Sequence, residues 1–152
     1  MKTVKELIKS FGYAFSGIAA AVRSERNFRI HIVAAGLVAG FGAVYGLTAS
    51  EWAIIAITIA LVLSSELFNT AVEAAVDRTG KHTEAFGKTA KDCAAGAVLV
   101  LAMAAVAVAI CIFSDTARLF PALISIFTTP IIFIFITYAI LSLIFIKWKN
   151  SN

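Results

Sequence analysis

Four long runs of apolar residues constrain this chain more than any other feature of its sequence. They cover about residues 30–47, 52–75, 94–113 and 119–146. An α-helix needs ~20 predominantly apolar residues to cross the hydrocarbon core of a bilayer. Hydrophobic residues make up 61% of the 152 residues, well above the share in soluble domains. The pattern predicts a small all-α integral membrane protein.

The four runs divide the chain into a core and a C-terminal addition. We expect residues 1–113 to form a three-span helical core, and residues 114–152 to add a fourth transmembrane helix and a short basic tail. The fourth run is longer than a span needs, and Pro121 and Pro130 are expected to mark its start and a kink. The first run is short and holds four glycines, which favours a tilted or tightly packed helix.

Positive charge predicts the orientation of the spans. Of the thirteen Lys and Arg residues, twelve lie before the first run, between the second and third, or after the fourth. Arg118 is the exception, in a turn on the opposite side. Because loops on the cytoplasmic side carry the excess of Lys and Arg, we expect a multi-pass protein with both termini in the cytoplasm.

Residues 3–22 differ from the four runs. Apolar side chains recur there at steps of three and four residues, while Lys5, Lys9 and Ser16 face elsewhere. This pattern predicts an amphipathic helix that lies in the cytoplasmic interface, as a surface anchor or as part of a site.

The second run carries acids on one face. Asn69, Glu73 and Asp77 follow Glu66 at offsets of three, seven and eleven residues, so all four fall along one stripe of a helix. An ionised carboxylate in hydrocarbon costs at least ~2.5 kcal/mol, so acids kept there mark functional sites. A stripe of this kind near one end of a span is typical of a metal and phosphate site at the membrane surface.

Depth gives the acids of this stripe different possible roles. Glu73 can reach a Mg²⁺ held by nucleotide phosphates, because Mg²⁺ takes one or two carboxylates plus phosphate oxygens. Glu66, about two turns deeper, can be a general base for a hydroxyl that comes from the bilayer. Two alternatives stay open: acids that hold helices together by pairing with basic residues, and a proton- or cation-coupled transporter. The position of the acids near one interface, rather than at the midplane, counts against a transporter.

Three further residues near the cytoplasmic surface carry candidate roles. Glu25, among three arginines, can complete a two-carboxylate metal site with Glu73 or form a solvated ion pair. His31 is either a satisfied interfacial histidine, which we favour, or a ligand. Lys91 stands near the start of the third run, where a helix N-terminus and a lysine both favour phosphate, and it also fits a topology signal.

Residues 66–77, Glu-Leu-Phe-Asn-Thr-Ala-Val-Glu-Ala-Ala-Val-Asp, resemble the signature of the prokaryotic diacylglycerol kinase and undecaprenol kinase family. Residues 90–92 and 25–29 match its other two motifs, in order and at the expected separation. The resemblance covers about residues 5–113. It implies a homotrimer of three-span subunits in the bacterial inner (plasma) membrane, each with an interfacial helix. It also implies phosphoryl transfer from MgATP to a membrane lipid alcohol at the cytoplasmic face.

The same resemblance implies roles for single residues. Glu66 is expected to be the catalytic base, with Asn69 supporting it. Glu25 and Glu73 are expected to hold the metal, and the lipid to contact Glu66 and Ala95. The residues expected at the nucleotide site are Tyr13, Glu25, Glu73, Asp77, His82, Glu84, Lys91 and Asp92.

Two departures from the family pattern shape the functional prediction. The fourth run has no counterpart in the three-span pattern and no charge over residues 119–146, so we expect it not to be catalytic. Glu6 stands where diacylglycerol kinases of Gram-negative bacteria carry Arg. Residues 26–31, Arg-Asn-Phe-Arg-Ile-His, are closer to the Gram-positive branch, whose members mainly phosphorylate undecaprenol. We therefore predict a lipid kinase, an ATP-dependent undecaprenol kinase, with diacylglycerol kinase as the alternative.

Overall fold

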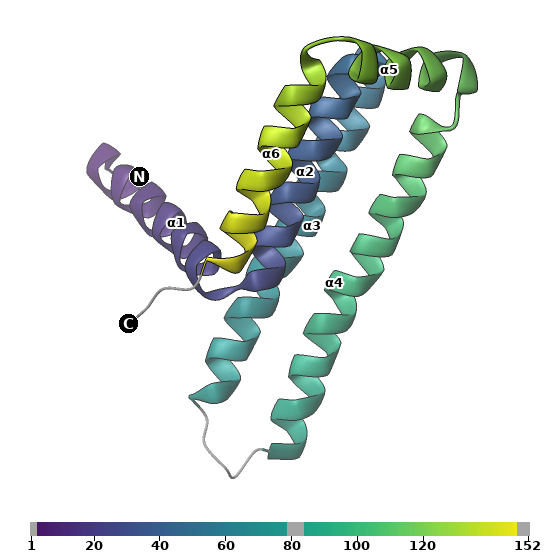
Figure 1. Cartoon of the computed structure of the whole chain (residues 1–152). Helices are drawn as coiled ribbons and strands as arrows, with labels where there is room; N and C mark the ends of the chain where they lie inside the picture. Colours follow the sequence, from purple (N-terminus) through teal and green to yellow (C-terminus); the bar gives the residue numbers. More distant parts are fainter. Residues whose placement is uncertain (1–2, 79–83, 149–152) are drawn as a thin grey trace.

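The structure is a computed structural model that describes residues 3–78 and 84–148. Over these residues the chain is helical apart from short turns, and no strand occurs in them (Figure 1). The predicted all-α class is therefore confirmed. The helices are α1 (Val4–Ser24), α2 (Arg26–Tyr45), α3 (Ala49–Asp77), α4 (Glu84–Phe113), α5 (Thr116–Thr128) and α6 (Ile131–Lys147).

Three of these helices, α2, α3 and α4, are long and apolar enough to cross a membrane. The bent pair of α5 and α6 raises the number of spans to four if it counts as one. α3 has 29 residues, which rise roughly 43 Å, so it extends well beyond a hydrocarbon core of about 30 Å. The acidic stripe occupies the end of α3 that carries this excess length.

The C-terminal run differs from the single kinked helix that the sequence predicts. It forms two helices with a bend of 84° between them. Pro130 is the N-cap residue of α6, and Thr129 before it is extended, with φ −118° and ψ 166°. Residues before proline avoid the helical region, which is why the chain breaks here instead of kinking. Pro121 lies inside α5, which already begins at Thr116.

The amphipathic segment forms α1 as expected and extends to Ser24. Thr3 and Glu6 form a capping box at its start. α1 leaves the base of the bundle at an angle, beside the first turn of α2 (Figure 1). Its large apolar side chains are exposed, which suits a helix that lies in a membrane interface. These exposed residues are Val4, Leu7, Ile8, Phe11, Phe15 and Ile18.

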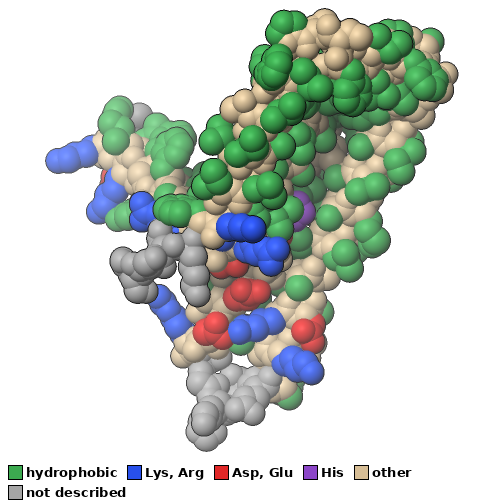
Figure 2. All heavy atoms as spheres, viewed as in Figure 1, with side chains coloured by type: hydrophobic (Ala, Val, Ile, Leu, Met, Phe, Trp, Pro, Cys, Tyr) green, Lys and Arg blue, Asp and Glu red, His purple; other side chains and the backbone are tan. Residues whose placement is uncertain are grey.

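The remaining helices pack around α2 and α3. α4 packs on α3, whereas α6 packs on α2, and α5 crosses the far end of the bundle (Figure 1). Charged side chains gather at the opposite end, near the α1–α2 junction and the end of α6 (Figure 2). This distribution agrees with the charge pattern of the sequence, and the cytoplasmic location of the termini stays a prediction.

α6 contacts a glycine face of α2. The Tyr138 hydroxyl donates to the Val33 carbonyl at 3.0 Å, and its ring occupies the space in which a Cβ on Gly36 would lie. A Cβ on Gly40 would make ordinary contact with the Phe135 ring, at 3.8 Å. Small residues let helices approach closely in membranes. The tight packing expected for the first run is thus found on this face.

A cluster of polar side chains, the outer clamp, joins α2, α3 and α5 at the far end of the bundle. Arg118 donates to both carboxylate oxygens of Glu51, at 3.1 and 2.6 Å, and to Asp115 at 3.1 Å. Its guanidinium lies 4.5 Å from the centre of the Tyr45 ring. The buried Tyr45 hydroxyl donates to the Ile112 carbonyl at 3.0 Å. The one basic residue expected on this side therefore holds α5 across the bundle.

We predict that Tyr45→Phe lowers the free energy of unfolding by about 0.5–1.5 kcal/mol, because a buried hydrogen bond is lost while the ring packing stays. Unfolding in detergent micelles, followed by helical circular dichroism, measures this change. Ser114→Ala is the control, since its exposed hydroxyl bonds the nearby Cys111 carbonyl. Equal stability of the two variants contradicts the structural role of Tyr45.

Candidate active site

Glu66 is the buried acid of α3. Its side chain is 3% exposed, and its Oε1 lies 3.2 Å from Nε2 of His31 on α2, which is 22% exposed. A buried carboxylate needs a polar or charged partner, and α2 supplies one. The sequence interpretation named His31 but did not connect it with Glu66. Their positions in the sequence offered a signal, because both residues lie inside apolar runs, near the end of each run that borders a cluster of Lys and Arg.

Two buried oxygens near this contact accept no hydrogen bond from the described part of the chain, Glu66 Oε1 and Asn69 Oδ1. The His31 ring lies at ion-pair distance from Glu66 Oε1. A buried acceptor without a donor costs about 1–3 kcal/mol, so both oxygens favour a polar ligand. They lie one turn apart on α3, where they can accept from a hydroxyl group.

Asn69 contacts Glu73 rather than Glu66. Its Nδ2 donates to Glu73 Oε1 at 3.0 Å, one turn along the helix. The support for Glu66 that we expected from Asn69 is therefore not a direct hydrogen bond. The amide fixes the position of Glu73 and leaves its own oxygen free.

Glu25 lies at the junction of α1 and α2. It is both the C-cap residue of α1 and the N-cap residue of α2. Its backbone is extended there, with φ −97° and ψ 114°. Just before it, Ala20 and Ala21 of α1 line a groove whose other wall includes Thr70 and Ala74 of α3. Glu25 therefore lies at the same end of the bundle as Glu73.

These acids can be tested against the needs of Mg²⁺. Within residues 3–78 and 84–148, no group of three or more His, Cys, Asp or Glu side chains is arranged to hold a metal ion. Mg²⁺ in nucleotide sites, however, takes only one or two carboxylates and completes its shell with phosphate oxygens and water. Glu25 and Glu73 fit a metal that arrives with a nucleotide, and do not fit a permanent protein-only cage.

Asp77 and Lys91 form an ion pair between α3 and α4. The structure places Lys91 two turns into α4, which begins at Glu84, so the expected position at a helix N-terminus is wrong. Its backbone N–H is used inside the helix, and any phosphate contact must come from its ammonium group. Asp92 and Ala95 are exposed on the same helix, next to Lys91 and one turn beyond it.

Tyr13 lines a groove between α1 and α3 of about 440 Å³. The ring is 66% exposed, and Lys9 Nζ lies 5.8 Å from its centre. The α3 wall of this groove is formed by the turns that follow Glu66, including Leu67, Thr70 and Ala74. Tyr13 therefore lies beside the acidic stripe, on the face that α1 covers.

Two predicted nucleotide-site residues cannot be placed. His82 lies outside the described residues, and Glu84 begins α4 but its side chain is outside the described part.

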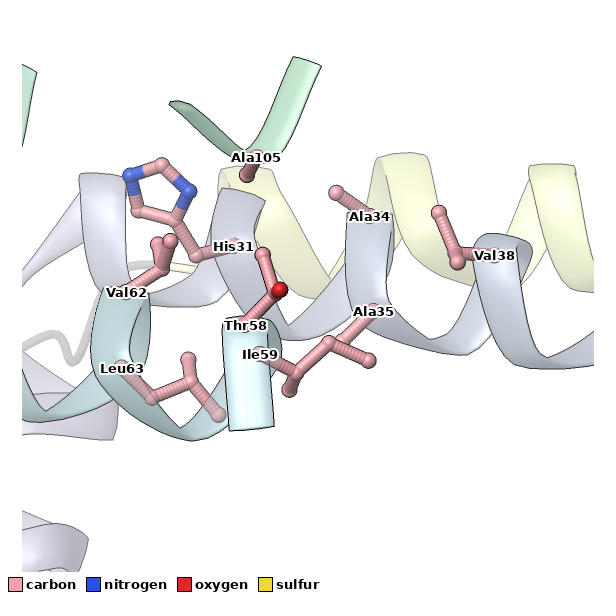
Figure 3. A pocket seen from close by; sticks show the side chains of 9 residues that line it. All are labelled: His31, Ala34, Ala35, Val38, Thr58, Ile59, Val62, Leu63 and Ala105. Atoms are coloured by element: carbon pink, nitrogen blue, oxygen red, sulfur yellow. The ribbon is translucent and has the colours of Figure 1, made fainter. Parts of the chain in front are cut away.

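An apolar groove adjoins the buried acid. It holds about 90 Å³ between α2, α3 and α4, with His31 at one end and alanine and β-branched side chains along its walls (Figure 3). A second hollow of about 60 Å³ shares four lining residues with it and continues towards the outer clamp. The shared residues are Val38, Thr58, Ile59 and Ala105.

The sequence of this chain matches the model of a known protein family. The model of the family described as prokaryotic diacylglycerol kinase matches residues 12–113, which contain Glu25, Glu66, Glu73 and Asp77. The chain belongs to the prokaryotic diacylglycerol kinase family. Residues 114–152, which include the bent pair of α5 and α6 (below, the C-terminal hairpin), lie outside the match.

Curated members of the prokaryotic diacylglycerol kinase family carry two names. A diacylglycerol kinase of Synechocystis sp. is 45% identical over 107 residues, 70% of this chain but only 61% of that protein's length. An undecaprenol kinase of Bacillus subtilis is 42% identical over 111 residues, 72% of this chain and 89% of that protein. A diacylglycerol kinase of Escherichia coli K12 is 33% identical over 100 residues, 66% of this chain and 82% of that protein.

The prokaryotic diacylglycerol kinase family is thus one of membrane lipid kinases, and kinase activity implies ATP as the phosphoryl donor. No solved structure matches the chain significantly.

We predict that Asn69→Ala raises the Mg²⁺ concentration needed for nucleotide binding about tenfold, because Glu73 loses the group that orients it. Glu73→Gln and Glu25→Gln should weaken binding further, with partial rescue at high Mg²⁺. A titration of Mg²⁺ against a fluorescent ATP analogue gives the measurement, and Ser64→Ala, exposed on the same helix, is the control. An unchanged Mg²⁺ dependence in all three variants removes these acids from the metal site.

Proposed function

We propose that this protein is an ATP-dependent undecaprenol kinase of the bacterial plasma membrane, which converts undecaprenol to undecaprenyl phosphate at the cytoplasmic face. The observation that carries the proposal is the buried Glu66 with His31 at the end of a narrow apolar groove. A lipid alcohol needs this combination: an apolar path for its chain and a base for its hydroxyl.

The proposed reaction is a direct phosphoryl transfer. Glu66 accepts the proton of the lipid hydroxyl, whose oxygen forms a bond to the γ-phosphorus as the bond to the ADP oxygen breaks. His31 holds the Glu66 carboxylate in place, and Asn69 Oδ1 is a second acceptor for the incoming hydroxyl. Glu25 and Glu73 would hold a Mg²⁺ that arrives with ATP, and the metal would supply positive charge to the phosphates. So small a chain suffices because phosphoryl transfer depends mostly on positioning and charge neutralisation.

The proposed nucleotide contacts lie at the cytoplasmic end of α3. Lys91, oriented by Asp77, supplies a positive charge to the phosphates, and Tyr13, Asp92, His82 and Glu84 belong to the same proposed site. Ala95, one turn beyond Lys91, is the proposed contact for the lipid head. The expected homotrimer is part of the proposal, since few residues in the apolar stretch of α4 are buried, which leaves much of this helix able to contact other subunits. The proposal also includes a membrane lipid kinase core of residues 1–113 and a separate C-terminal part of residues 114–152.

The shape of the groove favours one hydrocarbon chain over two. Its two hollows of about 90 and 60 Å³ are smaller than the roughly 300 Å³ of common ligand pockets, so they can take only part of one hydrocarbon chain at a time. Undecaprenol brings one linear chain past the base, whereas diacylglycerol brings two. The Bacillus subtilis relative that is named undecaprenol kinase, 42% identical to this chain, is one support for this choice.

Diacylglycerol kinase is the second candidate. It is supported by the Synechocystis sp. relative of that name, at 45% identity.

Transfer of radiolabelled phosphate from ATP decides between the two lipids. Purified protein in mixed micelles receives undecaprenol and diacylglycerol at equal concentration, and we expect label mainly in undecaprenyl phosphate. Label mainly in phosphatidic acid makes the second candidate correct. ATP turnover that depends on neither lipid contradicts both.

We predict that Glu66→Gln lowers kcat about 10²–10⁴-fold while nucleotide binding and assembly stay intact, since the amide keeps the shape but cannot accept the proton. The control is Glu51→Gln, an acid of the same helix in the outer clamp, which should keep its kcat. Near-normal turnover of the Glu66 variant removes this residue from the mechanism.

A further inference from the structure

The hairpin of α5 and α6 lies outside the family match and has no Asp, Glu, His, Lys or Arg over residues 119–146. It nevertheless contacts α2 at both ends of that helix, with α5 at the outer clamp and α6 along the glycine face. Any influence on the reaction must therefore act through the position of α2 and of the residues attached to it.

Arg29, in the first turn of α2, contacts both the hairpin and the end of α1. It is 6% exposed, and each of its hydrogen bonds goes to a backbone carbonyl in the described part of the chain. Nη1 donates to Val22 at 2.8 Å and to Arg23 at 3.2 Å, in the last turn of α1. Nε donates to Ile146 at 3.4 Å, in the last turn of α6.

These three carbonyls are chemically alike. The last carbonyls of a helix have no partner within the helix, and a cation near them is favourable. The Arg29 guanidinium, in the first turn of α2, thus donates to free carbonyls at the C-terminal ends of both α1 and α6. A buried cation held by carbonyls alone is a joint between α1, α2 and α6.

Glu25 stands inside this joint. It follows Arg23 by two residues and precedes Arg29 by four, and its own carbonyl accepts from the Arg29 N–H at 3.3 Å. The direction in which its carboxylate points depends on the angle between α1 and α2, which the Arg29 side chain helps to fix.

We propose that Arg29 is a positioning residue through which the C-terminal hairpin sets the affinity of Glu25 for a magnesium-bound nucleotide. The proposal rests on the proposed function in one respect, the role of Glu25 in holding the metal. Packing of α6 on the glycine face of α2 fixes the position of the Ile146 carbonyl. That carbonyl orients the Arg29 guanidinium, which in turn holds the end of α1.

Arginine suits this task better than lysine. Its planar head presents donors in several fixed directions, so it can reach carbonyls on both sides at once, whereas an ammonium group is a single point of charge. Arg29→Lys therefore keeps the charge at the membrane surface and removes the three-way joint.

The first experiment compares Arg29→Lys with Arg26→Lys in the full-length protein. For Arg29→Lys we expect KM for MgATP to rise about tenfold while kcat changes less than about twofold, in line with the loss of a group that orients a metal ligand. Equilibrium binding of a fluorescent ATP analogue should weaken by the same factor with Mg²⁺ and stay unchanged without it. Arg26 is exposed, and its variant should match the wild type.

The second experiment moves α6 without altering a residue of the site. Gly36→Ala places a methyl group in the space of the Tyr138 ring, whereas Gly40→Ala makes ordinary contact. Gly36→Ala should weaken Mg²⁺-dependent nucleotide binding about threefold, a smaller effect than Arg29→Lys because the guanidinium keeps its two bonds to α1. Gly40→Ala should bind as the wild type does.

Three outcomes overturn the proposal. Unchanged nucleotide binding in Arg29→Lys shows that Arg29 does not position Glu25. A loss of kcat at constant KM shows that it acts at the chemical step. Equal behaviour of the two glycine variants shows that the hairpin is not coupled to the site. Failure of the wild type to phosphorylate either lipid contradicts the proposed function instead, and leaves the binding measurements valid as a test of the joint.

Discussion

A carboxylate buried in a membrane-spanning helix must be matched by polar groups from neighbouring helices, and the structure depends on how Glu66 meets this condition. His31 approaches it from α2, which fixes the rotation of α2 against α3. The match is incomplete, because Glu66 Oε1 and Asn69 Oδ1 accept no hydrogen bond from the described residues. A side chain that is held but still able to accept a proton is what a general base requires.

Much of the fold and part of the site could be predicted from the sequence, because they depend on local pattern. The spans follow from apolar length, and the stripe of Glu66, Asn69 and Glu73 follows from helical periodicity. The contact between His31 and Glu66 depends on the rotation of one helix against another, which periodicity within a single helix does not encode. The sequence predicts a kink at Pro130 but not a break of this size, because packing of α6 on α2 decides the direction of the chain after Thr129.

The candidate site and the outer clamp lie at opposite ends of the helix bundle. The candidate site lies at one end, where α3 extends beyond the apolar core and α1 begins to diverge. The outer clamp of Tyr45, Glu51, Asp115 and Arg118 lies at the other end and fixes α5 across the bundle. Between them α2 is held on both sides, by α3 through Glu66 and by α6 through Tyr138. Rigid support on two sides suits a reaction that depends on placing two substrates accurately.

The bond from Arg29 to Ile146 joins residues 117 positions apart, near the beginning and the end of the chain. Membrane helices are inserted in the order in which the ribosome makes them, so α1, α2 and α3 are in place long before the acceptor on α6 exists. During that interval the Nε of Arg29 lacks the Ile146 carbonyl as its acceptor. The last turn of α6 then supplies that acceptor, next to the α1–α2 junction that carries Glu25. The order of synthesis thus makes this contact one of the last that the described helices form, so a growing chain without α6 has α1, α2 and α3 but not the complete three-way joint.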